Sequence, residues 1–305
     1  QVHKFDRFIP ESEVTQLGVK TVREQLANGV YQENDGAVIY DGESKGLHTR
    51  VFINSAGLPT YETKDVGLIL TKWADYHFDE SIMITANEQS QYFEVMLHSV
   101  SNFAPEPVGR TRHLSHGMVK LQGGVKMSSR KGNIVTALDI LQAARDAATE
   151  TNLGVNEETV LAAVKYAFVK VRIGGDISYD PAESIALEGN SGPYLQYAHA
   201  RARSILRKVT APTAVNTSEY LEDERTLALK LGEYSEAVNR ATHEYMPHHI
   251  CTYLYELAQT FNRFYEKNRV VGDEREAHRA ALVTRYADVL KNGLELLGIH
   301  APEKM

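Results

Sequence analysis

The sequence predicts an α/β domain followed by an all-helical bundle, and three observations lead to that prediction. Over the first hundred residues, short runs of β-branched and aromatic residues alternate with helical patterns. A short apolar run within residues 79–89 is typical of a buried parallel strand. From about residue 194 onward, only helical spacings occur. The order of these patterns indicates an α/β sheet first and a helix bundle second.

In the first part, two strands are predicted over 36–42 and 50–61. Apolar residues at helical spacing between Val66 and Trp73 predict a helix, with Thr63 as its N-cap. After the apolar strand, residues 90–103 predict the next helix. A strand–helix–strand–helix order places ligands at the C-terminal ends of the strands.

In the second part, glycine and proline separate a series of helical patterns. Two helices are expected over 137–152 and 157–173, followed by a loop-rich segment over 178–193. The bundle helices are expected over 194–209, about 219–241, 245–268 and 274–297. We therefore predict a first domain over 1–188 and a second over 189–305.

Composition excludes several classes of protein. The net charge of −7 argues against a chain coated in positive charge for unspecific nucleic-acid binding. The single cysteine, Cys251, excludes an internal disulfide framework and a cysteine-based zinc site, and favours a reducing, cytoplasmic setting. No apolar run has membrane-spanning length, and we expect no membrane association.

The segment "GGVKMSSRKGN" over 123–133 carries the clearest chemical signal. Its two leading glycines permit close approach of the backbone to a ligand. Lys126, Arg130 and Lys131 supply cations, while Ser128 and Ser129 supply hydroxyls. This combination suits a polyphosphate, although the spacing is not that of a Walker loop. A solvated basic turn is the alternative on composition alone.

An α/β region, a K-M-S-x-R loop and a helical bundle, in this order, resemble the layout of class I aminoacyl-tRNA synthetases. The loop is similar to their Lys-Met-Ser-Lys-Ser signature, with Ser129 in place of the second lysine. Five further segments resemble the arginyl-tRNA synthetases: "PTYETKDVG" (59–67), "ANEQSQYF" (86–93), "HGMV" (116–119), "SGPYLQYAHARARSILRK" (191–208) and the C-terminal "VLKNGLELLGIHAPEKM" (289–305). The resemblance implies a partial Rossmann-like catalytic domain followed by an anticodon-binding bundle.

The resemblance also implies roles for individual residues. The guanidinium of the substrate arginine needs a carboxylate partner, and the matching residues are Tyr61, Asp65 and Gln89. On residue type alone, Asp65 is a carboxylate at the start of a helix. The ATP-binding residues implied are His116, Gly117, Met118, Val119, Lys126 and Met127. Lys126, Ser128, Ser129 and Arg130 are the implied catalytic residues of the loop.

The bundle of this family holds splayed anticodon bases with tyrosines and its C-terminus. Tyr194, Tyr197 and Met305 occupy the matching positions. The alternative for the two tyrosines is helix packing. Arg201, Arg203 and Arg207 either face phosphates or form a solvated helix face.

The implied activity is the ATP-dependent attachment of arginine to tRNA(Arg). Arginine, ATP and tRNA(Arg) are the implied partners, and Mg²⁺ accompanies ATP. We expect no metal ligands from the protein. The full-length enzyme is expected to be a monomer.

The His-x-Gly-His signature of class I synthetases is not found, nor is anything that resembles the N-terminal domain of this family. We therefore expect the C-terminal half of an arginyl-tRNA synthetase, inactive alone. Two alternatives remain: a non-catalytic tRNA-binding or scaffold protein derived from a synthetase, and a cysteinyl-tRNA synthetase, against which the single cysteine argues. Absent strands would expose apolar edges, so we expect self-association through residues 1–120.

Overall fold

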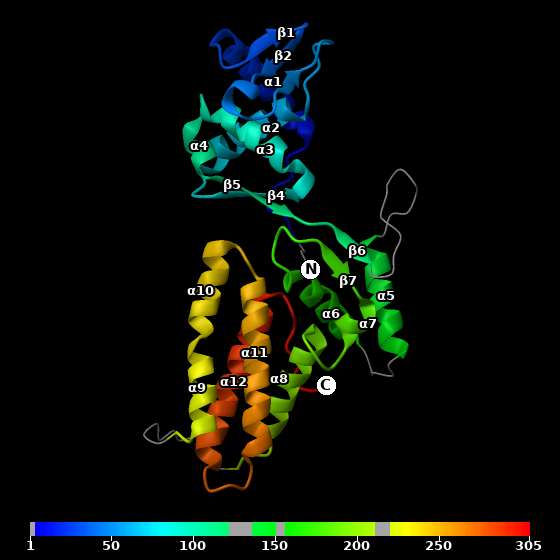
Figure 1. The fold of residues 1–305 in the computed structure, drawn as a ribbon, viewed down its shortest axis with the longest axis vertical. Coiled ribbons are helices and arrows are strands. Elements are labelled where there is room, and N and C mark those ends of the chain that lie inside the picture. Colours follow the sequence, from blue (N-terminus) through cyan, green and yellow to red (C-terminus); the bar gives the residue numbers. More distant parts are fainter. Residues whose placement is uncertain (1–3, 122–135, 151–155, 211–219) are drawn as a thin grey trace. The chain divides into compact units, whose positions relative to one another are not determined.

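The computed structural model describes residues 4–121, 136–150, 156–210 and 220–305 (Figure 1). The chain forms two compact units, Gln1–Met118 and Val119–Met305. The domain boundary predicted between residues 188 and 189 was drawn between two functions, whereas this division follows compactness. That boundary stays a prediction. Each unit is described by itself below.

The first unit begins with helix α1 (Glu11–Ala27) and a three-stranded antiparallel sheet in the order β1 (Gln32–Asn34), β2 (Ala37–Tyr40) and β3 (Arg50–Ile53). The 3₁₀ turn η1 (Glu43–Lys45) lies between β2 and β3. The remaining elements follow as α2 (Tyr61–Tyr76), β4 (Ser81–Ala86), the 3₁₀ turn η2 (Asn87–Gln89), α3 (Ser90–Ser101), α4 (Pro105–Gly109) and β5 (Thr111–His116). Strands β4 and β5 are parallel, in a register that pairs Ser81 with Thr111.

The core of the first unit lies between the antiparallel sheet and helices α1, α2 and α3. Phe52, Val66 and Met96 are fully buried in it. Helices α1 and α2 approach closely because glycines lie at their contact. A Cβ atom on Gly18 would lie 2.0 Å from the carbonyl oxygen of Thr63, so no larger residue fits there without a shift.

The structure confirms the two predicted strands, the parallel strand and both predicted helices of this unit. The prediction for Thr63 is wrong. Thr60 is the N-cap residue of α2, and the buried hydroxyl of Thr63 donates a 2.5 Å hydrogen bond to the carbonyl of Phe52 on β3. The expected burial of strand β4 is wrong as well, because Ile84 is 68% exposed.

The second unit combines a small α/β part with a helical bundle. Parallel strands β6 (Val119–Leu121) and β7 (Ile177–Tyr179) accompany helices α5 (Ala137–Glu150), α6 (Glu157–Val169) and α7 (Pro181–Ile185). The bundle consists of α8 (Gly192–Leu206), α9 (Glu222–Gly232), α10 (Tyr234–Glu244), α11 (His248–Lys267) and α12 (Glu276–Leu296).

The bundle has one continuous apolar core. Leu254, Leu257 and Leu290 are fully buried, and the rings of Phe261 and Tyr286 stack with centroids 3.9 Å apart. The predicted all-helical bundle is therefore confirmed, with one difference. The segment expected as one helix over about 219–241 contains two helices, which meet at Glu233 directly after Gly232.

Candidate functional site

A pocket of about 390 Å³ in the first unit contains the three residues expected to bind arginine. Tyr61 and Asp65 lie on the first turns of α2, and Gln89 ends η2 directly after strand β4. Four residues separate Tyr61 from Asp65, so both side chains lie on one face of the helix. The pocket is lined by Arg50, Tyr61, Glu62, Asp65, Thr85, Gln89, Tyr92 and Phe93. Residues at the C-terminal end of a parallel strand thus contribute to it, as the sequence predicts.

Asp65 is the half-buried carboxylate of this pocket. Burial raises the pKa of Asp65, while the hydrogen bond that the hydroxyl of Tyr92 donates to Oδ2 lowers it. The hydrogen bond fixes one carboxylate oxygen and leaves the other able to accept from a ligand. A planar cationic group is the natural partner for such a carboxylate.

A second carboxylate in the pocket is already neutralised. Glu62 lies 3.7 Å from the guanidinium of Arg50, whose central carbon lies 5.7 Å from the centre of the Tyr92 ring. Nε of Arg50 is buried and has no hydrogen-bond partner within the part of the chain that the structure describes. Because Arg50 is paired with Glu62, Asp65 supplies the available negative charge of the pocket.

Tyr61 and Gln89 form the open side of the pocket. Tyr61 is 67% exposed, with the ammonium of Lys64 4.8 Å from its ring centre, and Gln89 is exposed as well. Thr85, which also lines the pocket, forms a 2.7 Å hydrogen bond between its Oγ1 and Nε2 of His113.

Sequence reasoning missed Arg50, Glu62 and Tyr92. Helical spacing offered a signal for Tyr92, which lies three residues after Gln89. No local sequence pattern marks Arg50. It lies on β3, and only the folded structure brings that strand to the pocket.

A second pocket, of about 380 Å³, brings together Tyr197 and Met305 in the helical bundle. Tyr197 is 43% exposed and Met305 is 53% exposed, so both present apolar surface to solvent. The pocket is lined by Tyr197, Ala200, Arg201, Ser204, Arg207, Lys304 and Met305. An exposed aromatic ring flanked by cations is the arrangement that binds unpaired nucleotides.

Helix α8 holds the C-terminal tail beside this pocket through side chains on one helical face. Nε2 of Gln196 donates to the carbonyl of His300 (2.7 Å), and Nδ1 of His199 donates to the carbonyl of Pro302 (2.9 Å). One turn further along α8, Nε of Arg203 donates to the Glu303 carboxylate over 2.8 Å. We call these contacts the tail clamp. It places Met305 beside Tyr197.

The remaining residues expected in the bundle have other contacts. Tyr194 does not line the second pocket. Its hydroxyl accepts a 2.9 Å hydrogen bond from Asn262, and its ring packs edge-on against Tyr255. Arg203 is occupied by Glu303, whereas Arg201 and Arg207 line the pocket.

Part of the predicted nucleotide site lies outside the described residues. Lys126, Met127, Ser128, Ser129 and Arg130 all belong to that segment. His116, Gly117 and Met118 end the first unit, and Nδ1 of His116 donates to the carbonyl of Gly117 over 2.9 Å. Val119 begins the second unit as the first residue of β6.

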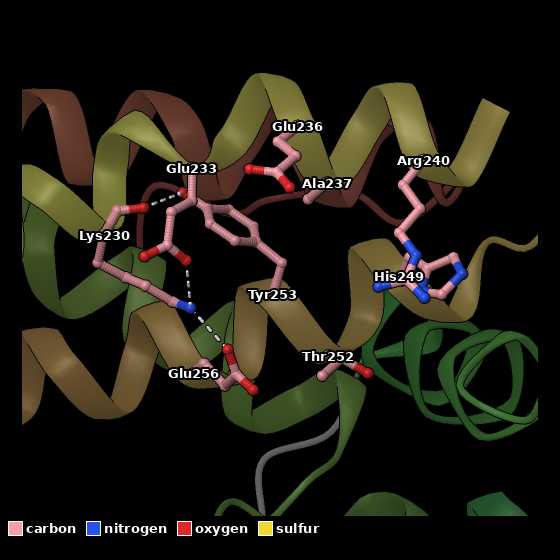
Figure 2. Close-up of a pocket in the computed structure, with 9 residues that line it drawn as sticks. All are labelled: Lys230, Glu233, Glu236, Ala237, Arg240, His249, Thr252, Tyr253 and Glu256. Atoms are coloured by element: carbon pink, nitrogen blue, oxygen red, sulfur yellow. Dashed lines mark hydrogen bonds and ion pairs between the residues drawn. The ribbon is translucent and has the colours of Figure 1, made fainter. Parts of the chain in front are cut away.

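A third pocket, of about 280 Å³, lies between helices α9, α10 and α11 (Figure 2). Lys230 pairs there with Glu233 and Glu256, and the hydroxyl of Tyr253 donates to the backbone carbonyl of Lys230. The ammonium of Lys230 is therefore compensated within the protein, as is the guanidinium of Arg240, which pairs with Glu244 (3.0 Å). None of the predicted site residues lines it.

Within residues 4–121, 136–150, 156–210 and 220–305, no group of three or more histidine, cysteine, aspartate or glutamate side chains could hold a metal ion. Among the same residues, no helix is long and apolar enough to cross a membrane.

Comparison with protein families gives two matches. The family described as "tRNA synthetases class I (R), catalytic domain" matches residues 9–179, which is more than half of the chain. The family described as "DALR anticodon binding domain" matches residues 195–305.

Individual relatives agree with these families. The arginine–tRNA ligase of Bacteroides fragilis is 32% identical over 325 residues, which cover 99% of this chain and 54% of the relative. That of Flavobacterium psychrophilum is 31% identical, with coverages of 99% and 53%. The chain thus spans about half the length of the curated relatives it matches.

Solved structures share the fold. The arginyl-tRNA synthetase of Thermus thermophilus superposes with a TM-score of 0.80 at 26% identity, over 96% of this chain and 59% of that one. The Plasmodium falciparum arginyl-tRNA synthetase also gives a TM-score of 0.80, over 98% and 54% of the two chains. At 21% identity, that second match shows likeness of fold alone.

Proposed function

The chain belongs to the class I arginyl-tRNA synthetase family, and on that premise we propose that it forms part of an arginine–tRNA ligase. The single observation that carries this proposal is the pocket around Asp65. It offers one available carboxylate, held by Tyr92, to a planar cation. Arginine is the amino acid whose side chain ends in such a cation.

The proposed reaction has two steps. A carboxylate oxygen of arginine attacks the α-phosphorus of ATP, which forms arginyl-adenylate and releases pyrophosphate. A ribose hydroxyl at the 3′ end of tRNA(Arg) then attacks the activated carbonyl carbon, and AMP leaves. Neither step needs a nucleophile from the protein, so positioning and charge stabilisation provide the catalysis.

Within this scheme, Asp65 accepts hydrogen bonds from the substrate guanidinium, while Tyr61 and Gln89 close the open side of the pocket. Lys126 and the serines that follow it are proposed to neutralise the phosphates of ATP, which enters with Mg²⁺. His116 to Val119 are proposed to flank the adenine. We expect this chemistry in the cytoplasm.

The second pocket is proposed to hold an anticodon base of tRNA(Arg). Tyr197 provides a stacking surface, and Met305 packs against the same base from the clamped tail. Tyr194 supports the pocket from the preceding turn of α8, because its ring and hydroxyl are fixed by Tyr255 and Asn262.

Calorimetric titration of this chain with L-arginine and with L-citrulline tests the amino-acid pocket. Citrulline has nearly the same shape and carries no charge. We expect arginine to bind about 10- to 100-fold more tightly, as charge-assisted hydrogen bonds of about 1.5–3 kcal/mol imply. Asp65→Asn should abolish the difference. Equal affinities for both ligands would contradict the proposal.

Binding of tRNA(Arg) and of the same tRNA with a replaced anticodon, at fixed salt, tests the bundle. Changing one read base should weaken binding by about 1–3 kcal/mol. Tyr197→Ala should remove that discrimination without unfolding the bundle, because Tyr197 is exposed. Tyr194→Ala should also lower the stability of the bundle.

The alternative function is a non-catalytic tRNA-binding or scaffold protein derived from a synthetase. The exposed face of β4 favours it, because that face could contact another protein. The two titrations distinguish the candidates. A scaffold retains discrimination between tRNAs and lacks preference for arginine over citrulline.

A further inference from the structure

A basic groove lies at the C-terminal end of helix α11. Its volume is about 610 Å³, and it is lined by Lys208, Tyr265, Glu266, Lys267, Asn268, Arg269, Val270 and Val271. Three of these residues are cations and one is an anion. The groove is therefore positive on a chain whose net charge is −7.

The groove adjoins the pocket formed by Tyr197 and Met305. Arg201 lines that pocket, and its guanidinium carbon lies 4.9 Å from the ring centre of Tyr265 in the groove. Arg207 lines the same pocket, and the next residue, Lys208, lines the groove. A polymeric ligand with one of its units in the pocket can therefore continue into the groove.

Most of the cationic side chains in the groove and in the Tyr197–Met305 pocket are not paired with carboxylates. Among the residues that the structure describes, no carboxylate oxygen lies within 4.0 Å of the cationic groups of Arg201, Arg207, Lys208, Arg269 or Lys304. Lys267 in the groove pairs with Asp223 (3.5 Å), and Arg203 beside the pocket pairs with Glu303. Lys230 in Figure 2, outside both sites, pairs with two glutamates. Uncompensated cations grouped on an acidic protein indicate an anionic partner.

The backbone around the groove is fixed in place. Nε of Arg269 donates to the carbonyl of Val271 (2.8 Å), and Arg279 donates to the carbonyl of Arg269 (2.6 Å). Val270 is buried in the bundle core. The backbone of this segment and the side chain of Arg269 are therefore held in place, which lowers the ordering entropy that binding requires.

We propose that this groove binds the phosphate backbone of the RNA strand that flanks the nucleotide in the Tyr197–Met305 pocket. Lys208 and Lys267 contact its phosphates, with Arg269 beside them. This inference rests on the proposed function of the bundle. Phosphate contacts position an RNA and carry no sequence information. The groove thus supplies affinity and register, while the pocket supplies discrimination between bases.

The test uses a hairpin with the anticodon stem and loop of tRNA(Arg), and a second hairpin with a replaced anticodon. Binding to this chain is measured by fluorescence anisotropy from about 50 to about 200 mM salt. Lys208→Gln should weaken binding about two- to tenfold at low salt, equally for both hairpins. It should also reduce the slope of log K against log salt by about 0.7–0.9. Lys267→Gln should change affinity and slope in the same direction but less, because Lys267 is already paired with Asp223.

Arg240→Gln is the matched control. It removes one exposed cation from α10, at the end of the bundle away from the connection between α11 and α12 (Figure 1). This variant should leave the affinity for both hairpins and the slope of log K against log salt unchanged. Lys208→Arg, which keeps the charge, should restore the wild-type slope.

The outcomes separate this inference from the proposed function. If the wild-type chain discriminates between the hairpins, and both lysine variants keep its affinity and salt slope, the groove proposal is overturned and the anticodon pocket stands. If the variants bind only one hairpin more weakly, the groove reads bases and the proposal is also overturned. If the wild-type chain binds neither hairpin, both the groove and the anticodon pocket are contradicted.

Discussion

The hydroxyl of Tyr92 donates a hydrogen bond to the carboxylate of Asp65. Tyr92 lies on α3 and is 7% exposed, while Asp65 lies on α2, so the bond joins two helices at the pocket. Burial makes Asp65 harder to ionise, and the hydrogen bond opposes that effect. The bond therefore orients Asp65 and maintains the charge that a guanidinium needs.

Replacing Tyr92 by phenylalanine should change the pH dependence of arginine binding. Only ionised Asp65 attracts the guanidinium, so affinity falls as the pH drops through the pKa of Asp65. Loss of a hydrogen bond that lowers this pKa raises it further, so in Tyr92→Phe the fall begins at higher pH. Calorimetric titrations with arginine from about pH 4 to about pH 8 measure the shift.

The control for this prediction is Tyr76→Phe. Tyr76 lies at the end of α2, is 55% exposed and does not line the pocket. Its variant should bind arginine with the wild-type pH profile. If Tyr92→Phe also keeps that profile, the hydrogen bond has no influence on the charge of Asp65.

Replacing Gly67 by alanine should destabilise the first unit. A Cβ atom at Gly67 would lie 2.2 Å from the carbonyl oxygen of Val14 on α1, so α1 and α2 would have to separate. Forced overpacking of this kind costs about 1–3 kcal/mol. Trp73 lies on α2 and is the single tryptophan of the sequence, so its fluorescence during urea unfolding reports on this unit alone.

Gly109→Ala provides the comparison, since a Cβ atom there would meet nothing within 4 Å. Its unfolding midpoint should match the wild type. A Gly67→Ala variant with an unchanged midpoint would show that the contact between α1 and α2 can relax without loss.

Glu224→Gln should destabilise the helical bundle by about 3–5 kcal/mol, because it removes the charge of a buried carboxylate that pairs with both Arg275 and Arg279. The side chain of Glu224 is inaccessible to solvent and accepts hydrogen bonds from Arg275 (2.9 Å) and Arg279 (3.0 Å). Far-UV circular dichroism during thermal unfolding measures the loss, and Trp73 fluorescence should not follow it. Glu236→Gln, an exposed change on α10, should have no effect on the bundle.

The same carboxylate predicts an acid limit for the bundle. Burial raises the pKa of Glu224, but hydrogen bonds from Arg275, the Leu221 amide and Arg279 outweigh burial and lower it to about 2. Because the folded-state pKa is depressed, its stabilising contribution is complete above the ordinary value of 4.5 and is lost as the pH falls towards 2. In Glu224→Gln, the stability of the bundle should be less dependent on pH over that window.

Local patterns predicted the helices well, because they depend on the spacing of apolar residues along a single segment. Helix α11 was expected over 245–268 and extends from His248 to Lys267, with Leu254, Leu257 and Phe261 facing the core. The family resemblance, and not a local pattern, identified Tyr61, Asp65 and Gln89 as pocket residues. The fold brings these three residues into one pocket.

Contacts between distant segments were not predictable from these patterns. Thr60 and Thr63 are equally suited by residue type to cap a helix, and in the fold the hydroxyls of both donate to the carbonyl of Phe52 on β3, a contact that the local pattern does not show. Gln196 and His199 have visible helical spacing, but the tail that they bind lies about a hundred residues further along the chain. Arg50 reaches the pocket from β3 in the same way.

The exposed face of strand β4 leads to the last prediction, which concerns self-association. Parallel strands are normally covered on both faces, yet Ile82 is 39% exposed and Ile84 is 68% exposed on one face of β4. We expect the wild-type chain to form dimers or larger species through residues 1–120, which light scattering at micromolar concentration detects. Ile84→Lys should shift the population towards monomer, because a charge on this face resists burial.

Leu138→Lys distinguishes this face from apolar exposure in general. Leu138 is 72% exposed on α5, in the second unit, so its replacement removes a similar area of apolar surface without touching β4. Equal loss of self-association in both variants would assign the effect to overall hydrophobicity rather than to β4. A wild-type chain that scatters light as a clean monomer would contradict the expectation, because the exposed strand would then be tolerated in water without a partner.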